Sequence, residues 1–189
     1  MSAVPGPDGK GRCPWAVTAP DYMAYHDDEW GRPVTDDRGL YERLCLEAFQ
    51  SGLSWLTILR KRENFRAAFA HFDMEKVAAF GDADRARLLA DTGIVRNRLK
   101  IDAAINNARA ALNVPGGLAE LVWSYADPDA PAPVEFGDVP ATTPGSKALA
   151  KDLKRNGFRF VGPTTVYALM QACGLVNDHL TGCFRRTEG

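Results

Sequence analysis

Apolar residues recur at three- and four-residue spacing along most of this chain, which is the period of a helix with one buried face. The clearest example lies between the acidic pair at 36–37 and Gly52, where Leu40, Leu44 and Ala48 stand four residues apart. An aspartate before the first apolar position and a glycine after the last are typical helix boundaries. The pattern therefore predicts a helix over this stretch.

The same reasoning predicts further helices, each bounded by a capping residue, a proline or a glycine. They begin at Ser54, Asp73 and Asp82 and extend over 96–112, 118–125, 146–156 and 163–173, with Ser146 as a cap and Pro163 in a first turn. Residues 127–144 contain five prolines and few large apolar groups, so they are predicted to form a surface loop. No alternating pattern of useful length indicates a strand. The predicted fold class is all-α.

The bulk properties are those of a single soluble unit. The length of 189 residues indicates one domain, and residues 1–11 are rich in Gly and Pro. We therefore expect a disordered lead-in over 1–11 and a single helical domain over 12–189. No apolar run approaches the about 20 residues that span a bilayer, and the N-terminus lacks a signal-peptide core, so a cytoplasmic protein is expected. The net charge is -1, so a nucleic-acid partner requires a local basic patch.

Two pairs of potential metal ligands lie near opposite ends of the sequence: Cys13 with His26, and His179 with Cys183. Two thiolates and two imidazoles are the number and type of ligand that zinc prefers in closed tetrahedral sites. If all four meet, a structural zinc ties the start of the fold to its end and keeps no open position for catalysis. The four cysteines could instead form two disulfides, but without a secretion signal free thiols and metal ligands are favoured.

A glycine-bounded turn between the last two long helices is a candidate DNA contact. The residues concerned are Arg159 and Gly162 in the turn and Thr164 and Thr165 in the helix that follows. Unpaired backbone amides at such a helix start accept phosphate oxygens, and basic residues nearby suit a phosphate backbone without reading its sequence. Four more basic residues lie in the preceding helix: Lys147, Lys151, Lys154 and Arg155. The alternative is that these lysines only complement the negative end of their own helix.

Aromatic residues crowd the first half of the chain. Trp15, Tyr22, Tyr25 and Trp30 lie in a loop-rich N-terminal segment, and Trp55 follows the turn Gly52-Leu53-Ser54. Glu47 lies on the apolar stripe of the predicted helix before that turn, where a carboxylate is costly to bury without a partner. Aromatic walls around one buried acid suit a flat, nitrogen-rich and cationic ring. The alternative, which the residue types alone favour, is that the aromatics form core and Glu47 pairs locally.

Taken together, these residues resemble the 3-methyladenine DNA glycosylase I family of alkylation repair. The resemblance runs from about residue 12 to 183. Its motifs are Arg12-Cys13-Pro-Trp15, Tyr25-His26-Asp-Asp-Glu-Trp30-Gly31, Leu46-Glu47, Gln50-Ser-Gly52-Leu53-Ser54-Trp55, Lys61-Arg-Glu-Asn64, Gly93-Ile-Val-Arg-Asn97-Arg98, Phe158-Arg-Phe-Val-Gly162 and Met170-Gln-Ala-Cys-Gly-Leu-Val-Asn-Asp-His179. It implies an all-α helix-hairpin-helix fold with one structural zinc per chain, held by Cys13, His26, His179 and Cys183.

The resemblance also implies roles for the candidate pocket. Glu47 is expected to contact the excised base, and the pocket is expected to be lined by Trp15, Tyr22, Tyr25 and Trp55. Leu53, beside Gly52, is expected on the loop that enters the DNA where the nucleotide is extruded. The partner implied is double-stranded DNA with an alkylated purine, and a monomer that does not contact membranes is expected.

The stretch Val176-Asn177-Asp178-His179 bears on the mechanism. Related helix-hairpin-helix glycosylases carry a catalytic aspartate where this chain has Asn177, and bifunctional relatives carry a lysine nucleophile where it has Thr164. The predicted reaction is therefore hydrolysis of the N-glycosidic bond of 3-methyladenine, without a lyase step. Two rival classes are a zinc-held DNA-binding module without base release and a zinc hydrolase. The latter needs an open coordination position that four protein ligands do not leave.

Overall fold

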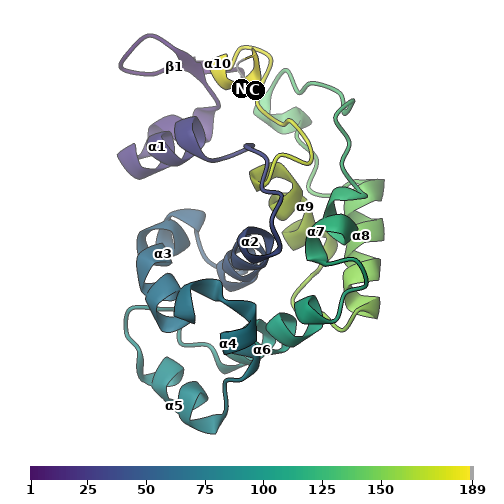
Figure 1. The fold of residues 1–189 in the computed structure, drawn as a ribbon. Coiled ribbons are helices and arrows are strands. Elements are labelled where there is room, and N and C mark those ends of the chain that lie inside the picture. Colours follow the sequence, from purple (N-terminus) through teal and green to yellow (C-terminus); the bar gives the residue numbers. More distant parts are fainter. Residues whose placement is uncertain (188–189) are drawn as a thin grey trace.

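The computed structural model describes residues 1–187 and consists mainly of helices (Figure 1). The helices are α1 (Pro20–Asp28), α2 (Asp37–Gln50), α3 (Trp55–Ala68), α4 (Met74–Ala78), α5 (Asp82–Ala90), α6 (Arg98–Leu112), α7 (Leu118–Trp123), α8 (Pro144–Arg155), α9 (Pro163–Ala172) and α10 (Phe184–Thr187). Within residues 1–187, short 3₁₀ helices cover Pro14–Thr18, Ala70–Phe72 and Phe136–Asp138, and the strands β1 (Val4–Pro5) and β2 (Gly11–Arg12) pair antiparallel. The predicted mainly helical architecture is confirmed.

Helix α2 occupies the centre of the fold and packs against α3, α6, α7 and α9 (Figure 1). Its predicted cap is present, because the Asp36 carboxylate accepts a hydrogen bond from the Gly39 amide at 2.8 Å. Contact on several sides explains why nearly every side chain from Leu40 to Phe49 is buried. The stripe of Leu40 and Leu44 is therefore one part of a helix that is buried all round, and Glu47 lies inside it.

The predicted starts of the other helices are confirmed at Ser54 and Asp73, whose side chains accept from the third amide along. The expected cap at Ser146 is wrong. Thr143 caps α8, and Ser146 lies in its first turn, where Thr143 Oγ1 accepts from the Ser146 amide and Ser146 Oγ accepts from the Thr143 amide. Threonine and serine are both good caps. Proline is favoured as the first residue of a helix, so Pro144 starts α8 and the residue before it, Thr143, becomes the cap.

The N-terminal region contains more regular structure than its sequence indicates. Where a disordered lead-in is expected over 1–11, Val4 pairs with Arg12 and Pro5 with Gly11 in a hairpin. Where a loop-rich segment is expected, helix α1 is present and buries Tyr25 and His26. Its remaining residues are polar or only partly buried, so its apolar periodicity is weak. The N-terminal hairpin and helix α10 lie at the same end of the molecule, where α10 contacts β2 (Figure 1).

Helices α8 and α9 are joined by the predicted glycine-bounded turn and pack against each other. Gly157 adopts a φ of 87°, which an L side chain disfavours. The buried Asn107 of α6 fixes this turn, because its amide donates to the Arg159 carbonyl at 2.9 Å and its oxygen accepts from the Arg159 amide at 2.8 Å. Within residues 1–187, no helix has the length and apolarity needed to cross a membrane.

Candidate active site and metal centre

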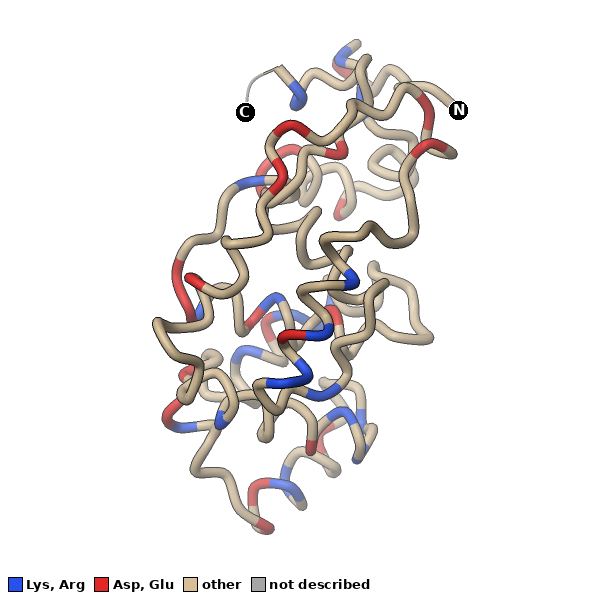
Figure 2. The backbone as a smooth tube through the Cα atoms, turned by 90° about the vertical axis from the view of Figure 1, so that its right-hand side faces the viewer, with Lys and Arg blue, Asp and Glu red and all other residues tan. Residues whose placement is uncertain are grey.

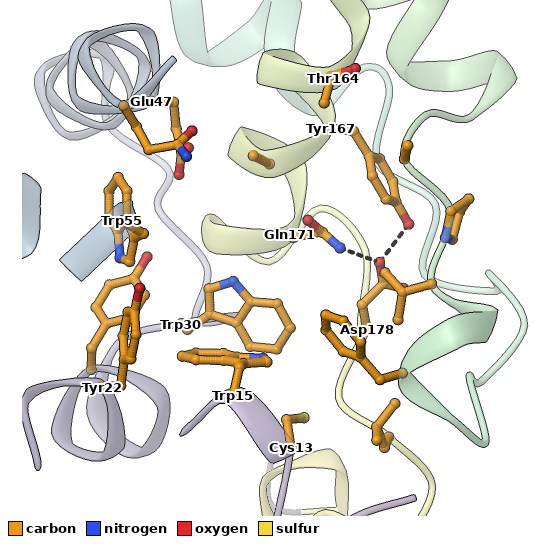
Figure 3. Close-up of a pocket in the computed structure, with 18 residues that line it drawn as sticks. Cys13, Trp15, Tyr22, Trp30, Glu47, Trp55, Thr164, Tyr167, Gln171 and Asp178 are labelled. Atoms are coloured by element: carbon orange, nitrogen blue, oxygen red, sulfur yellow. Dashed lines mark hydrogen bonds between the residues drawn. The ribbon is translucent and has the colours of Figure 1, made fainter. Parts of the chain in front are cut away.

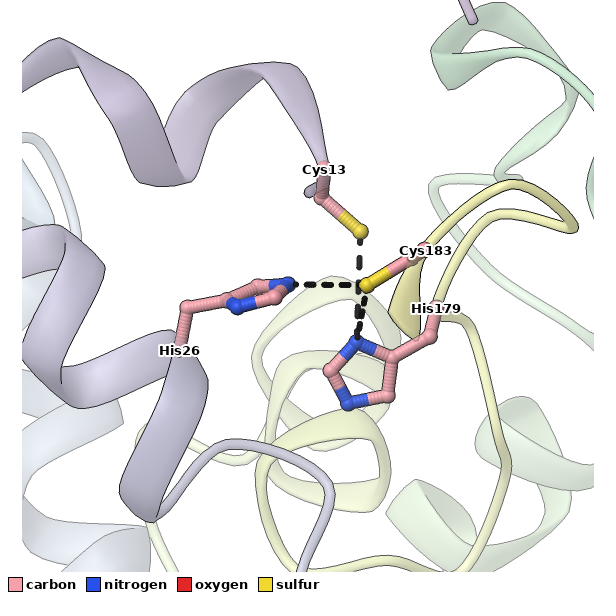
Figure 4. A group of neighbouring side chains, drawn as sticks. All are labelled: Cys13, His26, His179 and Cys183. Atoms are coloured by element: carbon pink, nitrogen blue, oxygen red, sulfur yellow. Dashed lines mark hydrogen bonds between the residues drawn. The ribbon is translucent and has the colours of Figure 1, made fainter. Parts of the chain in front are cut away.

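The four predicted metal ligands meet in one buried cluster (Figure 4). One donor atom from each of Cys13, His26, His179 and Cys183 lies within 4.8 Å of the others. Cys13 and His26 come from the N-terminal segment, and His179 and Cys183 come from the loop that leads into α10. Residues that are 166 positions apart in the chain, Cys13 and His179, are thus brought to 3.9 Å between Sγ and Nδ1.

The donor set and its spacing fit zinc. Zinc–sulfur bonds of about 2.3 Å and zinc–nitrogen bonds of about 2.0–2.1 Å at tetrahedral angles separate sulfur from nitrogen by about 3.5 Å. Cys183 Sγ lies 3.4 Å from His26 Nε2 and 3.5 Å from His179 Nδ1. Hydrogen bonding with Cys13 and then with both imidazoles lowers the pKa of Cys183, so one thiolate is already favoured. The cluster could hold a metal ion with four protein ligands.

Outer hydrogen bonds orient both imidazoles toward the cluster. His26 Nδ1 lies 2.8 Å from Asp27 Oδ1, which leaves Nε2 for the cluster. His179 Nε2 lies 3.2 Å from the Trp30 carbonyl, which can only accept, so Nδ1 is left for the cluster. Buried Arg12 in turn holds Asp27, at 2.7 Å between Nη2 and Oδ2. Metal-binding histidines commonly have such outer partners.

A cavity of about 460 Å³ lies beside this cluster (Figure 3). This is within the usual volume of small-ligand pockets, which are mostly apolar with a few placed polar groups. It contains all five predicted base-pocket residues, which are Trp15, Tyr22, Tyr25, Glu47 and Trp55. Trp30, the other aromatic residue of the expected N-terminal cluster, also lines it, and so do residues that the sequence did not indicate, among them Phe136, Tyr167, Gln171 and Asp178.

The aromatic side chains of the cavity support one another edge to face. Trp15 lies 5.6 Å from Tyr22 and 5.2 Å from Trp30 between ring centroids, with interplanar angles of 84° and 80°. Tyr25 and Trp55 lie 5.5 Å apart in a tilted arrangement. Such pairs hold ring faces in fixed orientations, so a flat ligand meets preformed walls.

Glu47 is the buried acid of this cavity, with 6% of its surface exposed. Burial raises the pKa of its carboxyl group to about 8. Its carboxylate has no hydrogen bond to another residue in the part of the chain that the structure describes. Trp55 Nε1 is likewise a buried donor without a partner among the described residues. One unpaired acid and one unpaired donor in an aromatic cavity complement a heterocycle with both N–H groups and acceptor nitrogens.

The opposite side of the cavity carries a second acid, Asp178 (Figure 3). Its Oδ2 accepts from the Tyr167 hydroxyl at 2.5 Å and from Gln171 Nε2 at 2.8 Å. This hydrogen bond comes second to burial as a cause of the raised pKa of Tyr167. Tyr167 and Gln171 are four residues apart on α9, a spacing that could have marked a common face. Nothing in the local sequence indicates that this face meets Glu47.

The turn after α2 carries the predicted DNA-entering residues. Gly52 adopts a φ of 82°, and Leu53 is 39% exposed, which is high for a leucine. Neither residue lines the cavity. Lys100 of α6 anchors the turn, because its Nζ donates to the Phe49 carbonyl at 2.8 Å and to the Ser51 carbonyl at 2.6 Å. Desolvation lowers the pKa of this buried lysine.

We expect Lys100→Met to lower the free energy of unfolding by about 1–3 kcal/mol, because both carbonyls lose a charged donor while the aliphatic stem is kept. The measurement is urea denaturation at neutral pH. The control is Lys76→Met, since Lys76 is exposed and only 3.6 Å from Asp73 in a surface ion pair; its effect should stay within about 0.5 kcal/mol. Equal stability of Lys100→Met and the parent protein would show that the anchor contributes nothing.

The candidate DNA-contacting residues of the hairpin lie at the surface. Arg159 and Thr164 are exposed, Gly162 and Thr165 are partly buried, and Thr164 alone among them also lines the cavity. The basic residues of α8 border a second, shallow hollow with Pro163. Figure 2 faces the side of the molecule that carries α8, and several Lys and Arg positions gather at mid-height of that view. The hairpin therefore presents positive charge and a helix N-terminus at the edge of the cavity.

These features define a helical protein with an aromatic-lined pocket beside a buried Cys/His cluster. A model of the methyladenine glycosylase family matches residues 15–186. The chain is 50% identical over 177 residues to DNA-3-methyladenine glycosylase 1 of Escherichia coli (strain K12), across 91% of this chain and 95% of that protein. The protein therefore belongs to the methyladenine glycosylase family.

Solved structures agree with this placement. A crystal structure of 3-methyladenine DNA glycosylase I matches with a TM-score of 0.88 at 52% identity, covering 92% of this chain and 98% of that one. A structure of 3-methyladenine DNA glycosylase I from Staphylococcus aureus, which addresses how that protein recognises 3-methyladenine, matches with a TM-score of 0.88 at 36% identity. The match covers 93% of this chain and 96% of that one. The predicted family resemblance is confirmed.

Proposed function

We propose that this protein is a monofunctional DNA glycosylase that hydrolyses the N-glycosidic bond of 3-methyladenine in alkylated duplex DNA. The observation that carries the proposal is the buried, unpartnered Glu47 inside an aromatic cavity. Family membership supports it, because the E. coli relative carries the name DNA-3-methyladenine glycosylase 1. We further propose that the chain from residue 12 onward acts as one domain in this reaction.

The chemistry of the substrate suits this pocket. Methylation at N3 gives the nucleobase a positive charge, which the bond-breaking step relieves as the electron pair of the glycosidic bond moves onto the base. The barrier is therefore already lower than for adenine, and much of the work is extrusion and positioning of the nucleotide. Glu47 is proposed to accept from the N–H groups of the base, and the aromatic residues Trp15, Tyr22, Tyr25 and Trp55 to enclose its faces.

The surface around the cavity supports DNA binding. Gly52 permits the turn that exposes Leu53, which is proposed to fill the space left by the extruded nucleotide. At the hairpin, the helix N-terminus at Gly162, Thr164 and Thr165 is proposed to hold phosphates, with Arg159 adding positive charge. The hairpin is thus proposed to act as a helix-hairpin-helix element, and the protein as a monomer.

The absence of a lyase step is part of the proposal. Thr164 occupies the hairpin position at which a Schiff-base lysine would be needed, and a hydroxyl forms no imine with an abasic sugar. Water is therefore proposed as the nucleophile that reaches the sugar carbon. The Cys/His cluster is proposed to hold one structural zinc, which four protein ligands exclude from this step.

The proposal predicts release of free 3-methyladenine when the protein is incubated with methylated duplex DNA. Chromatography identifies the purine, and a denaturing gel tests for strand cleavage. Abasic sites that break only after heating in alkali are expected, because the protein supplies no lyase. DNA binding without any freed purine would instead favour the rival class, a DNA-binding module. Immediate strand cleavage would contradict the monofunctional assignment.

A further inference from the structure

Helix α6 carries two buried polar side chains, and each of them binds the backbone of one segment proposed above to contact DNA. Lys100 Nζ donates to the Phe49 and Ser51 carbonyls, where α2 ends and the turn after it begins. The side-chain amide of Asn107 donates to the Arg159 carbonyl of the hairpin and accepts from the Arg159 amide. One helix therefore anchors both segments.

The two anchors lie on one face of α6, seven positions apart. Seven residues of an α-helix make nearly two full turns and a rise of about 10.5 Å. The positions between them on this face, Ala103 and Ala104, are apolar and buried. Since α6 also packs against α2, α4 and α5, it is held in place along its length. The helix thus keeps the turn after α2 and the hairpin at a fixed separation.

The hairpin backbone beside Asn107 is strained. Phe160, the residue after Arg159, adopts a φ of 56°, in the left-handed region that a bulky L side chain disfavours. Its ring gains little burial in return, because 40% of the residue is exposed. Strain of this kind persists where surrounding contacts impose it, and it gathers at functional segments. Asn107 therefore helps to impose one backbone shape on the segment that leads into the helix start at Gly162.

We propose that Lys100 and Asn107 are positioning residues that together set the distance between the Leu53 turn and the hairpin, so that one DNA duplex engages both while a nucleotide is extruded. Extrusion costs the stacking and pairing of that nucleotide. Simultaneous contact of both segments offsets this cost only if their separation matches the duplex. Neither residue touches DNA: each acts through the backbone that it holds. This inference rests on the proposed function.

The first test measures kcat/KM for excision of 3-methyladenine from methylated duplex DNA by Lys100→Met and by Asn107→Ala. Each value is expected to fall about 10-fold, because a displaced segment no longer fits the same duplex. Binding of free 3-methyladenine should change less than about 3-fold, since neither residue lines the cavity. The matched control is Tyr41→Phe, which removes a buried hydrogen bond to the Ala104 carbonyl of α6 and touches neither segment. Excision by this control should stay within about 3-fold of the parent protein.

The double variant separates a shared role from two local ones. The anchors have no common partner and lie about 10.5 Å apart along the helix, so their shifts of the unfolding midpoint in urea should add. Excision should behave differently. The spacing is already lost when either anchor is removed, so the double variant should fall no more than about 3-fold below the weaker single variant. Two independent local roles would multiply to a loss of about 10²-fold.

A second measurement follows the spacing itself. Nitroxide labels are placed at Ser51→Cys and Phe160→Cys, one exposed position in each segment, while the four native cysteines are buried. Double electron–electron resonance should give a narrow distance distribution in the labelled parent protein. Lys100→Met or Asn107→Ala should broaden or shift it, and Tyr41→Phe should not.

Three outcomes overturn the inference: excision at the parent rate by either folded single variant, multiplied losses in the double variant, or a distance distribution that the anchor variants leave unchanged. The distance measurement needs only one folded anchor variant and no activity, so it decides the matter even if the double variant does not fold. No purine released by the parent protein itself would instead refute the proposed function.

Discussion

Glu47→Gln is expected to reduce single-turnover excision of 3-methyladenine by about 10²–10³-fold, the range seen when one preorganised electrostatic contact is removed from an active site. Glutamine keeps the volume of the side chain but presents an N–H group where the base also presents one. Binding of the free base should weaken as well, since Glu47 is proposed to contact the base and not the sugar. Quenching of the cavity tryptophans measures that binding directly.

The matched control for this substitution is Glu42→Gln on the same helix. Glu42 is 9% exposed but faces Arg66, away from the cavity. It should lower stability through the broken ion pair and leave the excision rate of the folded protein within about 3-fold. Excision by Glu47→Gln at the parent rate would remove Glu47 from the reaction.

The same substitution should leave a signature in stability as a function of pH. The carboxyl group of Glu47 has an ordinary pKa of 4.5, and burial raises its pKa in the folded protein to about 8. The fold therefore prefers the protonated form: this contribution to stability is complete below pH 4.5 and is lost as pH rises through about 8. Glutamine does not ionise, so the stability of Glu47→Gln relative to the parent protein should rise with pH across that window, by at most about 1.4 kcal/mol per pH unit.

Cys13→Ala is expected to lower the free energy of unfolding by more than about 4 kcal/mol and to reduce the bound metal from one ion per chain to substoichiometric amounts. Structural zinc sites contribute about 10 kcal/mol or more of apparent binding free energy in small domains, and loss of one thiolate forfeits much of it. Most of the marginal stability of a domain would be removed. Thermal melting and metal analysis of the same samples measure both effects.

Cys45→Ala is the matched control for the metal site. Cys45 is as buried as Cys13, at 1% exposed, but lies in the core of α2 away from the cluster. Its replacement should cost only the packing of one sulfur atom, about 1–2 kcal/mol, with metal content unchanged. A Cys13→Ala protein that melts at the same temperature as Cys45→Ala and still excises base would contradict a structural role for the cluster.

Features set by neighbouring residues could be predicted from the sequence. The caps at Asp36, Ser54 and Asp73 depend on a side chain and an amide three residues apart. The four cluster residues could be selected because the chain has few cysteines and histidines. Two thiols and two imidazoles are also the ligand set that a closed zinc site prefers. The expected cap at Ser146 was wrong, because Thr143 also has a hydroxyl group and the two side chains each accept from the other's amide.

The second wall of the cavity could not be predicted, because it exists only through tertiary packing. Asp178 is 131 positions from Glu47 by their residue numbers (178 minus 47), and the contact of α2 with α9 brings them to one cavity. Phe136 reaches the cavity from a proline-rich stretch that the sequence marks only as surface loop. Helix α1 was not predicted, because only Tyr25 and His26 are buried in it and its sequence therefore shows no apolar periodicity.

The joining of Cys13 to His179 and Cys183 also has a consequence for synthesis of the chain. Synthesis proceeds from the N-terminus, so Cys13 and His26 are made well before His179 and Cys183. Until then, Trp15 and its aromatic neighbours have no Asp178 or Leu180 to close the cavity against. A chain interrupted before Asp178 therefore lacks one side of the cavity, so the pocket forms only after both halves of the cluster have been made.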